Sequence, residues 1–122
     1  RYVAADPLTT GLFAILFHEL AVGWAGFWES EWDGTAQWEC GWHLKTPYQG
    51  RGIATAAMHS ALAEARSRGS HGFVDAFPSV DNAASNALCA RLGFHDLGEA
   101  EVEYPKGRMM QARHWRYDLE SP

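Results

Sequence analysis

The sequence predicts an α+β fold with a mixed, mostly antiparallel central sheet flanked by helices. Three strand-like segments precede the first helical segment, only two segments have apolar residues at helical spacing, and two strand-like segments end the chain. The predicted order is therefore β-β-β-α-β-α-β-β. The chain of 122 residues, 47% hydrophobic and 13% aromatic, is sufficient for one domain with a packed core.

The first three predicted strands are residues 12–17, 22–28 and 37–45. The short link at residues 18–20 favours a hairpin, and Asp33-Gly34 is a turn signal. Along the third strand, alternate side chains share a face. One face carries Trp38, Cys40, Trp42 and Leu44, and the other carries Glu39, Gly41, His43 and Lys45.

The first predicted helix, Ile53 to Arg68, is rich in alanine, and Gly69 just beyond it is a typical C-terminal signal. After a strand at residues 72–77, Ser79 or Asp81 is expected to cap a second helix. The remaining predicted elements are the helix Asn82 to Leu92, closed by Gly93, and strands at residues 94–104 and 109–119.

The composition excludes several classes of protein. A net charge of −5 argues against a nucleic-acid binder, and it suits a cationic partner or plain solubility equally well. The longest apolar run, Gly11 to Phe17, is too short to span a membrane. Cys40 and Cys89 form neither a disulfide framework nor a metal-ligand spacing, so we expect no metal and a reduced, cytoplasmic setting.

Six tryptophans are many for this length, and most are expected in the core. Trp28 and Trp32 are the candidates for the wall of a substrate pocket, where they could form a cation–π cage for a charged amine.

Gly50 and Gly52 lie where the third strand gives way to the first helix. Glycines at such a junction let the backbone turn with its N–H groups outward, and the helix N-terminus adds donors and positive dipole. Together they predict a site for a phosphorylated ligand. The dinucleotide fingerprint is not met, because position 55 is Thr, and the P-loop pattern also fails.

The loop Gln49-Gly50-Arg51-Gly52-Ile53-Ala54 fits the pattern Gln/Arg-x-x-Gly-x-Gly/Ala. It resembles the acetyl-CoA loop of the GNAT superfamily of N-acetyltransferases. The segment from Asn82 through Ser85 to Gly93-Phe94 is similar to the family's second signature helix, and residues 39–44 look like its fourth strand. The resemblance covers Leu12 to Leu119, and the Asn-x-x-Ser form looks most like the branch with the ribosomal-protein N-terminal acetyltransferases.

The resemblance implies acetyl-CoA as co-substrate. Residues expected to bind it are the loop residues Gln49, Gly50, Arg51, Gly52, Ile53 and Ala54 at the pyrophosphate, backbone groups of Trp42, His43 and Leu44 at the pantetheine and acetyl carbonyl, and Asn82 at the pantetheine arm. Arg51 could equally be solvated, and Asn82 could equally be a helix cap.

Two catalytic residues are implied. Glu39 is the base by resemblance, although His43 has the better unperturbed pKa. Ser85 is the candidate acid for the departing thiolate, and its alternative is a hydrogen bond to its own helix backbone. Many family members carry Tyr where Cys89 stands, and a cysteine there is more often a buried small hydrophobe.

The implied activity is transfer of an acetyl group to a primary amine by direct attack on the thioester, with an amine-bearing small molecule or a protein N-terminus as acceptor. The alternative is a non-catalytic acyl-CoA-binding or interaction module on the same fold. The family's usual first strand and helices are not found, so residues 1–122 are expected to form a single acetyltransferase-like domain that is N-terminally incomplete relative to the family. Strand or subunit exchange into a homodimer could cover its bare sheet edge.

Overall fold

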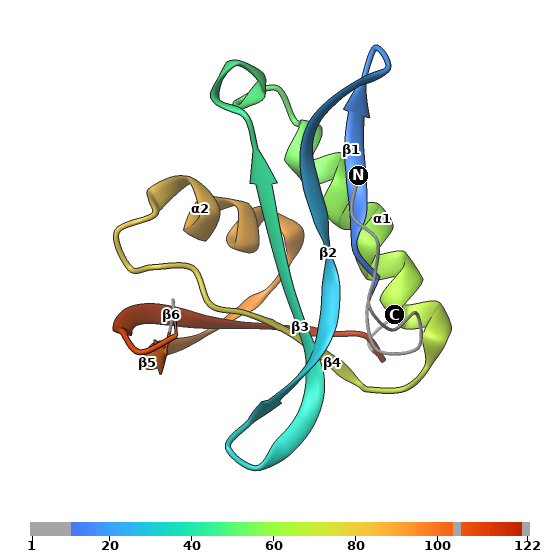
Figure 1. Cartoon of the computed structure of the whole chain (residues 1–122). Coiled ribbons are helices and arrows are strands. Elements are labelled where there is room, and N and C mark those ends of the chain that lie inside the picture. Colours follow the sequence, from blue (N-terminus) through green and yellow to red (C-terminus); the bar gives the residue numbers. More distant parts are fainter. Residues whose placement is uncertain (1–10, 104–105, 121–122) are drawn as a thin grey trace.

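The computed structural model describes residues 11–103 and 106–120, which form one six-stranded sheet and two α-helices (Figure 1). The strand order is β1-β2-β3-β4-β6-β5, and only β3 and β4 pair in parallel. The elements are β1 (Phe13–Phe17), β2 (Leu20–Trp32), β3 (Thr35–Leu44), a short 3-10 helix (Thr46–Tyr48), α1 (Ile53–Arg68), β4 (Phe73–Ala76), α2 (Ala83–Leu92), β5 (His95–Glu103) and β6 (Met109–Asp118). The predicted fold class and element order are confirmed.

Two tight hairpins connect the first three strands. His18 and Glu19 turn β1 into β2, and Asp33 and Gly34 turn β2 into β3, all with positive φ. A two-residue loop in which both residues have positive φ forms a type I′ turn, whose twist matches the twist of the two flanking strands. Strand β2 continues past its predicted end at residue 28, because residues 29–32 pair with β3 although they are mostly polar.

The helices share one face of the sheet. Buried residues of α1, such as Met58 and Leu62, and of α2, such as Leu88, form one apolar cluster with Trp38 and Leu44 of β3. The predicted alternation along β3 therefore holds, and Glu39 points to the opposite face. None of the described helices is long and apolar enough to cross a bilayer.

Strands β3 and β4 at the centre of the sheet are paired over a short distance only and then diverge. β3 and β4 are paired only at Trp38 with Val74 and at Glu39 with Asp75. The Lys45 N–H donates a hydrogen bond to the Val22 carbonyl of β2 at 2.8 Å. In an antiparallel ladder, successive residues direct their backbone N–H and C=O groups alternately toward the paired strand and away from it. Trp42, three residues before Lys45, therefore directs its N–H and C=O away from β2. These groups face the opening left by β4.

Glycine and asparagine mark the helix ends, and the N-termini of both helices lie beside this opening. α1 begins after Gly52 and ends before Gly69, as predicted. α2 is capped by Asn82, whose side chain accepts a hydrogen bond from the Ser85 N–H. The prediction of Ser79 or Asp81 as the cap is wrong, since the chain completes a turn there before the helix starts.

Candidate active site

A cavity of about 520 Å³ lies between the end of β3 and the N-termini of the two helices. It brings together all the residues predicted to bind the cofactor except Arg51. Its lining residues include Trp42, His43, Leu44, Gln49, Gly50, Gly52, Ile53, Ala54 and Asn82.

The floor of this cavity suits an anion. Gly50 and Gly52 have φ of 77° and 79°, which L-residues adopt only with strain. No side chain caps α1 at Gly52, and its first turn carries no acidic residue. The N-terminal N–H groups of the helix are therefore available to phosphate oxygens, with the dipole favouring negative charge.

Two loop side chains have structural contacts of their own. The Gln49 side-chain amide donates to the Leu44 carbonyl at 2.8 Å, which ties the loop to the end of β3. The Arg51 guanidinium lies 6.0 Å from the Phe17 ring centroid and 5.8 Å from that of Tyr48. Arg51 thus sits beside the cavity rather than in its lining.

Asn82 and Ser85 stand at the inner end of the cavity. The Asn82 Oδ1 accepts from the Ser85 N–H at 3.1 Å, so Asn82 caps α2 while it also lines the cavity. Among the described residues, the Ser85 hydroxyl has no hydrogen-bond partner. The alternative in which this hydroxyl bonds to its own helix is therefore not what the structure shows.

Cys89 is unsuited to the role of an acid. Its side chain is buried, and this burial raises the pKa of the thiol to about 12. It packs in the apolar core, as the sequence predicts for a small hydrophobe.

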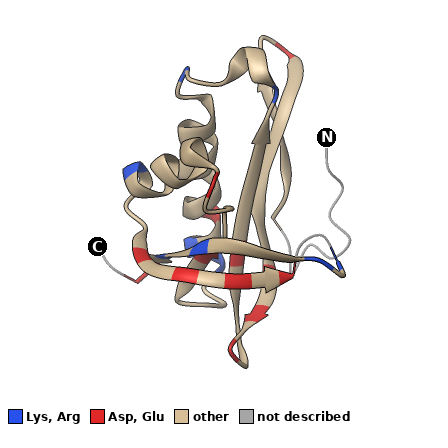
Figure 2. Ribbon diagram, turned by 90° about the vertical axis from the view of Figure 1, so that its left-hand side faces the viewer, with Lys and Arg blue, Asp and Glu red and all other residues tan. Residues whose placement is uncertain are grey.

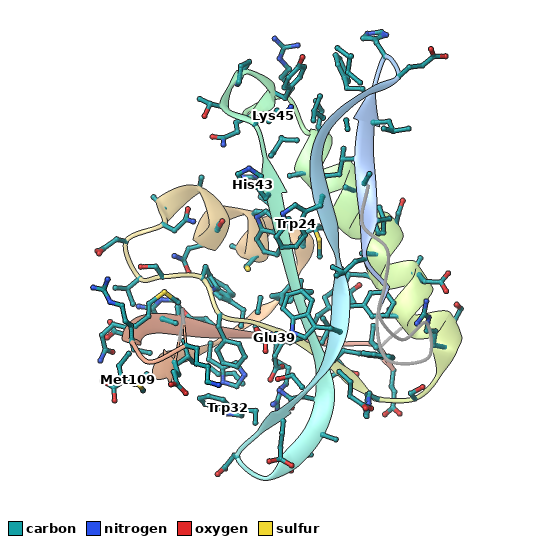
Figure 3. All side chains as sticks on the ribbon, in the orientation of Figure 1. Trp24, Trp32, Glu39, His43, Lys45 and Met109 are labelled. Carbon is teal, nitrogen blue, oxygen red and sulfur yellow. The ribbon has the colours of Figure 1, made fainter. Side chains whose placement is uncertain are left out.

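A second cavity, of about 660 Å³, opens on the sheet face that carries Glu39. It shares Trp42, Asn82 and Ser85 with the first cavity, so the two meet there. Glu39 lines the second cavity together with Ser85, whereas His43 lines only the first. Figure 3 shows His43, Trp24, Glu39 and Trp32 following one another along the β2–β3 ribbon.

Tryptophans wall the second cavity. Trp28 and Trp32 are half-buried lining residues, as the sequence analysis expected for a pocket wall, and Trp24, for which the core expectation is wrong, lines the cavity beside them. The reason is that β2 places these even-numbered residues on the face away from the helices. Gly41 leaves room for them, since a Cβ there would lie 2.9 Å from the Trp28 ring and 3.4 Å from that of Trp24.

Glu39 has the environment of a base. Burial raises the pKa of its carboxyl above the usual range; a hydrogen bond with Ser30 offsets the rise in part, and the nearby Asp75 carboxylate adds to it. A carboxylate with a raised pKa takes up a proton more readily than an exposed one.

Behind Glu39 lies a buried polar network that the sequence analysis missed. Asp75 is 0% exposed, and Arg116 donates to both of its oxygens at 2.8 and 2.9 Å. The His114 Nε2 lies 2.7 Å from Asp75 Oδ2, and the Gln37 amide also donates to this oxygen. The sequence feature that could have revealed this network is Asp75, a single acidic residue inside the apolar strand sequence GFVDAF.

Burial of Asp75 disfavours its charged form, but the hydrogen bonds from Arg116 and His114 outweigh this and lower the pKa of the carboxyl. Asp75 is therefore a fixed negative charge next to Glu39.

Comparisons with known proteins agree with this geometry. A family model described as acetyltransferase (GNAT) domain matches residues 2–95. Among curated proteins, none matches this chain. In solved structures, yncA of Salmonella typhimurium, assigned as an acetyltransferase and holding acetyl-CoA, is 23% identical with a TM-score of 0.76; 94% of this chain and 68% of that one are covered.

Ribosomal-protein acetyltransferases are also among the similar structures, as the resemblance implied. The ribosomal-protein-S5-alanine acetyltransferase of Vibrio fischeri is 19% identical with a TM-score of 0.77, over 93% of this chain and 65% of that one. The Salmonella typhimurium acetyl transferase that modifies the N-terminal serine of the 50S ribosomal subunit protein L7/L12 is 21% identical with a TM-score of 0.73. The match covers 90% of this chain and 64% of that one.

At these identities the structures show a shared fold, and this chain spans about two thirds of their length. The family is one of acetyltransferases, and acetyl-CoA as co-substrate is confirmed at the level of the family. With its sheet, its glycine loop and a family match over most of its length, the chain belongs to the GNAT acetyltransferase family.

Proposed function

We propose that this chain is an acetyl-CoA-dependent N-acetyltransferase that moves the acetyl group to a primary amine by direct attack on the thioester. One observation carries the proposal: the cavity between the helix N-termini meets the cavity of Glu39 at Trp42, Asn82 and Ser85. Two molecules bound from the two sides would therefore meet beside a candidate base and a candidate acid.

The residues present fit acetyl-CoA. The uncapped N-terminus of α1 and the turn at Gly50 and Gly52 would hold its pyrophosphate. The unpaired edge of β3 at Trp42 would offer backbone N–H and C=O groups to the pantetheine arm and to the acetyl oxygen as its negative charge grows. When bound, acetyl-CoA supplies the acetyl thioester.

Glu39 and Ser85 would move the protons. A lysine-like amine is neutral for less than about one part in a thousand at pH 7, so the Glu39 carboxylate takes its proton, directly or through water. The C–N bond then forms as the C–S bond breaks. The Ser85 hydroxyl, half-buried and without a hydrogen-bond partner in the described residues, gives a proton to the departing thiolate. The proton that the new amide nitrogen sheds, passed directly or through water, restores this hydroxyl.

Calorimetric titration with acetyl-CoA, followed by detection of the released thiol on addition of an amine panel, tests the function. The proposal expects binding and amine-dependent thiol release. Binding with no release on any amine would instead support the non-catalytic acyl-CoA-binding module.

The role of the glycine loop predicts unequal effects at the two ends of α1. Gly52→Leu and Gly69→Leu should each cost roughly 1–2 kcal/mol, because both sites have positive φ and no atom within 4 Å of an added Cβ. Only Gly52→Leu should weaken acetyl-CoA binding, by about a hundredfold, since it obstructs charge-assisted N–H contacts. Equal affinities of the two variants in calorimetry would rule out this phosphate site.

Removal of the Ser85 hydroxyl should slow the reaction without weakening cofactor binding. Ser85→Ala is expected to lower kcat about a hundredfold, the lower end of the usual contribution of a positioned acid, because the thiolate loses its proton donor. Ser60→Ala, an exposed serine on α1, is the matched control and should keep full activity. An unchanged kcat in Ser85→Ala would assign the proton to another donor, such as water.

The cellular setting and assembly remain predictions. Both cysteines are buried and unpaired, which suits the reduced cytoplasm that the sequence predicted. Within residues 11–103 and 106–120, β1 forms one edge of the sheet and carries exposed Leu16, so we retain the homodimer prediction; a molar mass in solution tests it.

A further inference from the structure

The wall of the Glu39 cavity that comes from β2 is aromatic. Trp28 is paired with Glu39 across β2 and β3, so the two side chains lie on the same face of the sheet. Side chains alternate along a strand, so Trp32 lies on this face as well. Both tryptophans line the cavity and are half-buried, and their rings therefore border the space in front of the Glu39 carboxyl.

The opposite wall comes from β6 and β5 and is apolar. Glu39 is paired with Asp75, and Asp75 with Arg116, so alternation along β6 brings Met110 to the face of Glu39. Met110 is paired in turn with Val102 of β5. Both residues line the cavity and are half-buried. A molecule in this cavity is thus in contact with apolar side chains on two sides.

A third aromatic side chain, Phe77, is held from behind by a buried imidazole. The Phe77 ring stacks on His114, with centroids 4.6 Å apart and an interplanar angle of 23°, and its centroid lies 4.8 Å from that of Trp32. His114 is 7% exposed, and its Nε2 lies 2.7 Å from Asp75 Oδ2, so packing and this contact fix the imidazole. Phe77 and Trp32, which both line the cavity, therefore form a preformed aromatic wall.

Among the described lining residues, Glu39 is the one charged side chain on this face of the sheet. Glu31, Glu101 and Glu103 also belong to the lining, and Figure 2 shows acidic residues repeating along β5. However, their pairing with β3 and β6 places these three exposed side chains on the opposite face. The cavity therefore offers a single negative charge to a bound molecule.

We propose that the acceptor is a primary amine with one positive charge, attached to an apolar, aromatic body. This rests on the proposed function. The amine lies at Glu39, which takes its proton, and the body lies against Trp28, Trp32 and Phe77. An aromatic ring gains from such walls both the burial of apolar area and ring–ring contacts. A second ammonium would lose its hydration against apolar side chains without a carboxylate to meet it.

The first test compares 3-phenylpropylamine with butylamine, two amines of similar basicity that carry one charge each. With acetyl-CoA saturating, kcat/KM for 3-phenylpropylamine should be at least about tenfold higher, because the ring buries additional apolar area. This preference should persist when salt rises from about 0.05 to 0.5 M, since no second charge contributes to it. For 1,4-diaminobutane, kcat/KM should not exceed that of butylamine beyond the statistical factor of about two, because its second ammonium finds no partner.

A second pair of acceptors identifies the source of the amine. A peptide that begins with phenylalanine presents the same chemistry on a protein N-terminus, and Phe-Ala-Ala with Ser-Ala-Ala forms the matched pair. A preference of at least about tenfold for Phe-Ala-Ala would support the proposal and assign the apolar amine to a protein N-terminus. A preference that is confined to 3-phenylpropylamine would support it and assign a small molecule.

Paired variants locate the effect. Trp32→Leu removes a ring of the wall and should lower the ratio of kcat/KM for 3-phenylpropylamine to that for butylamine at least about fivefold. Phe73→Leu also removes a ring on the same face of the sheet, but outside the cavity, and should keep the wild-type ratio. Calorimetric titration with acetyl-CoA, which occupies the other cavity, shows that both variants are folded.

The outcomes separate this inference from the function. Equal kcat/KM within both the amine pair and the peptide pair would overturn this proposal and leave the acetyltransferase standing. A clear preference for the diamine over butylamine, or an unchanged ratio in Trp32→Leu, would do the same. Turnover of no amine despite acetyl-CoA binding would overturn both.

Discussion

Glu39→Gln should lower kcat/KM for amine acetylation by about 10²- to 10⁴-fold, the usual contribution of a positioned base. The substitution keeps size and the ability to accept from Ser30, but it removes the group that takes the amine proton. The folded protein should be no less stable at pH 7, because burial already disfavours the charged carboxylate. Steady-state kinetics and thermal unfolding separate the two effects.

The pH profile gives an independent check. The pKa of Glu39 is raised, so the active carboxylate form is lost as pH falls through a value above the usual range of Glu. Wild-type kcat/KM should show this acidic limb, and Glu39→Gln should lack it. Glu29→Gln, a change on the neighbouring strand at a residue paired with His71, is the matched control. A retained limb in Glu39→Gln would assign the base elsewhere.

Asp75→Asn should cost about 3–5 kcal/mol of folding free energy, because it leaves Arg116 without its buried counter-charge. For a domain of this size, that corresponds to a fall in melting temperature of at least about 10 °C. The exposed pair of Asp96 with Arg113 offers a matched control. Asp96→Asn should cost less than about 1 kcal/mol, as surface pairs usually do.

The pH dependence of this loss has a definite sign. Because the pKa of Asp75 is lowered in the folded state, its stabilisation is present above the unfolded pKa of about 3.9 and is lost as pH falls through the folded value. Denaturant unfolding should show the full gap between wild type and Asp75→Asn at pH 7 and a smaller gap near pH 3. A gap that does not narrow would contradict this role of Asp75.

Local signals made most of the fold and the first cavity predictable. Gly52 and Gly69 marked the ends of α1, and the loop from Gln49 to Ala54 placed the first cavity, because backbone conformation and helix ends depend on neighbours in sequence. Strand β2 was predicted too short, since pairing with β3, rather than its own composition, extends it to Trp32.

The second cavity depended on contacts between distant segments. Asp75, His114 and Arg116 lie on two strands that are far apart in the sequence, and no spacing rule links them. Trp24 looked like a core residue because its spacing along the strand cannot tell which face of a sheet the helices cover.

The early parting of β3 and β4 has a kinetic consequence. In the proposed reaction, this gap would admit acetyl-CoA from the side of the helix N-termini and the amine from the tryptophan side, so neither would have to leave before the other arrives. Double-reciprocal plots at several fixed concentrations of the second reactant should therefore intersect rather than run parallel. No acetylated form of the protein itself should build up when the amine is withheld.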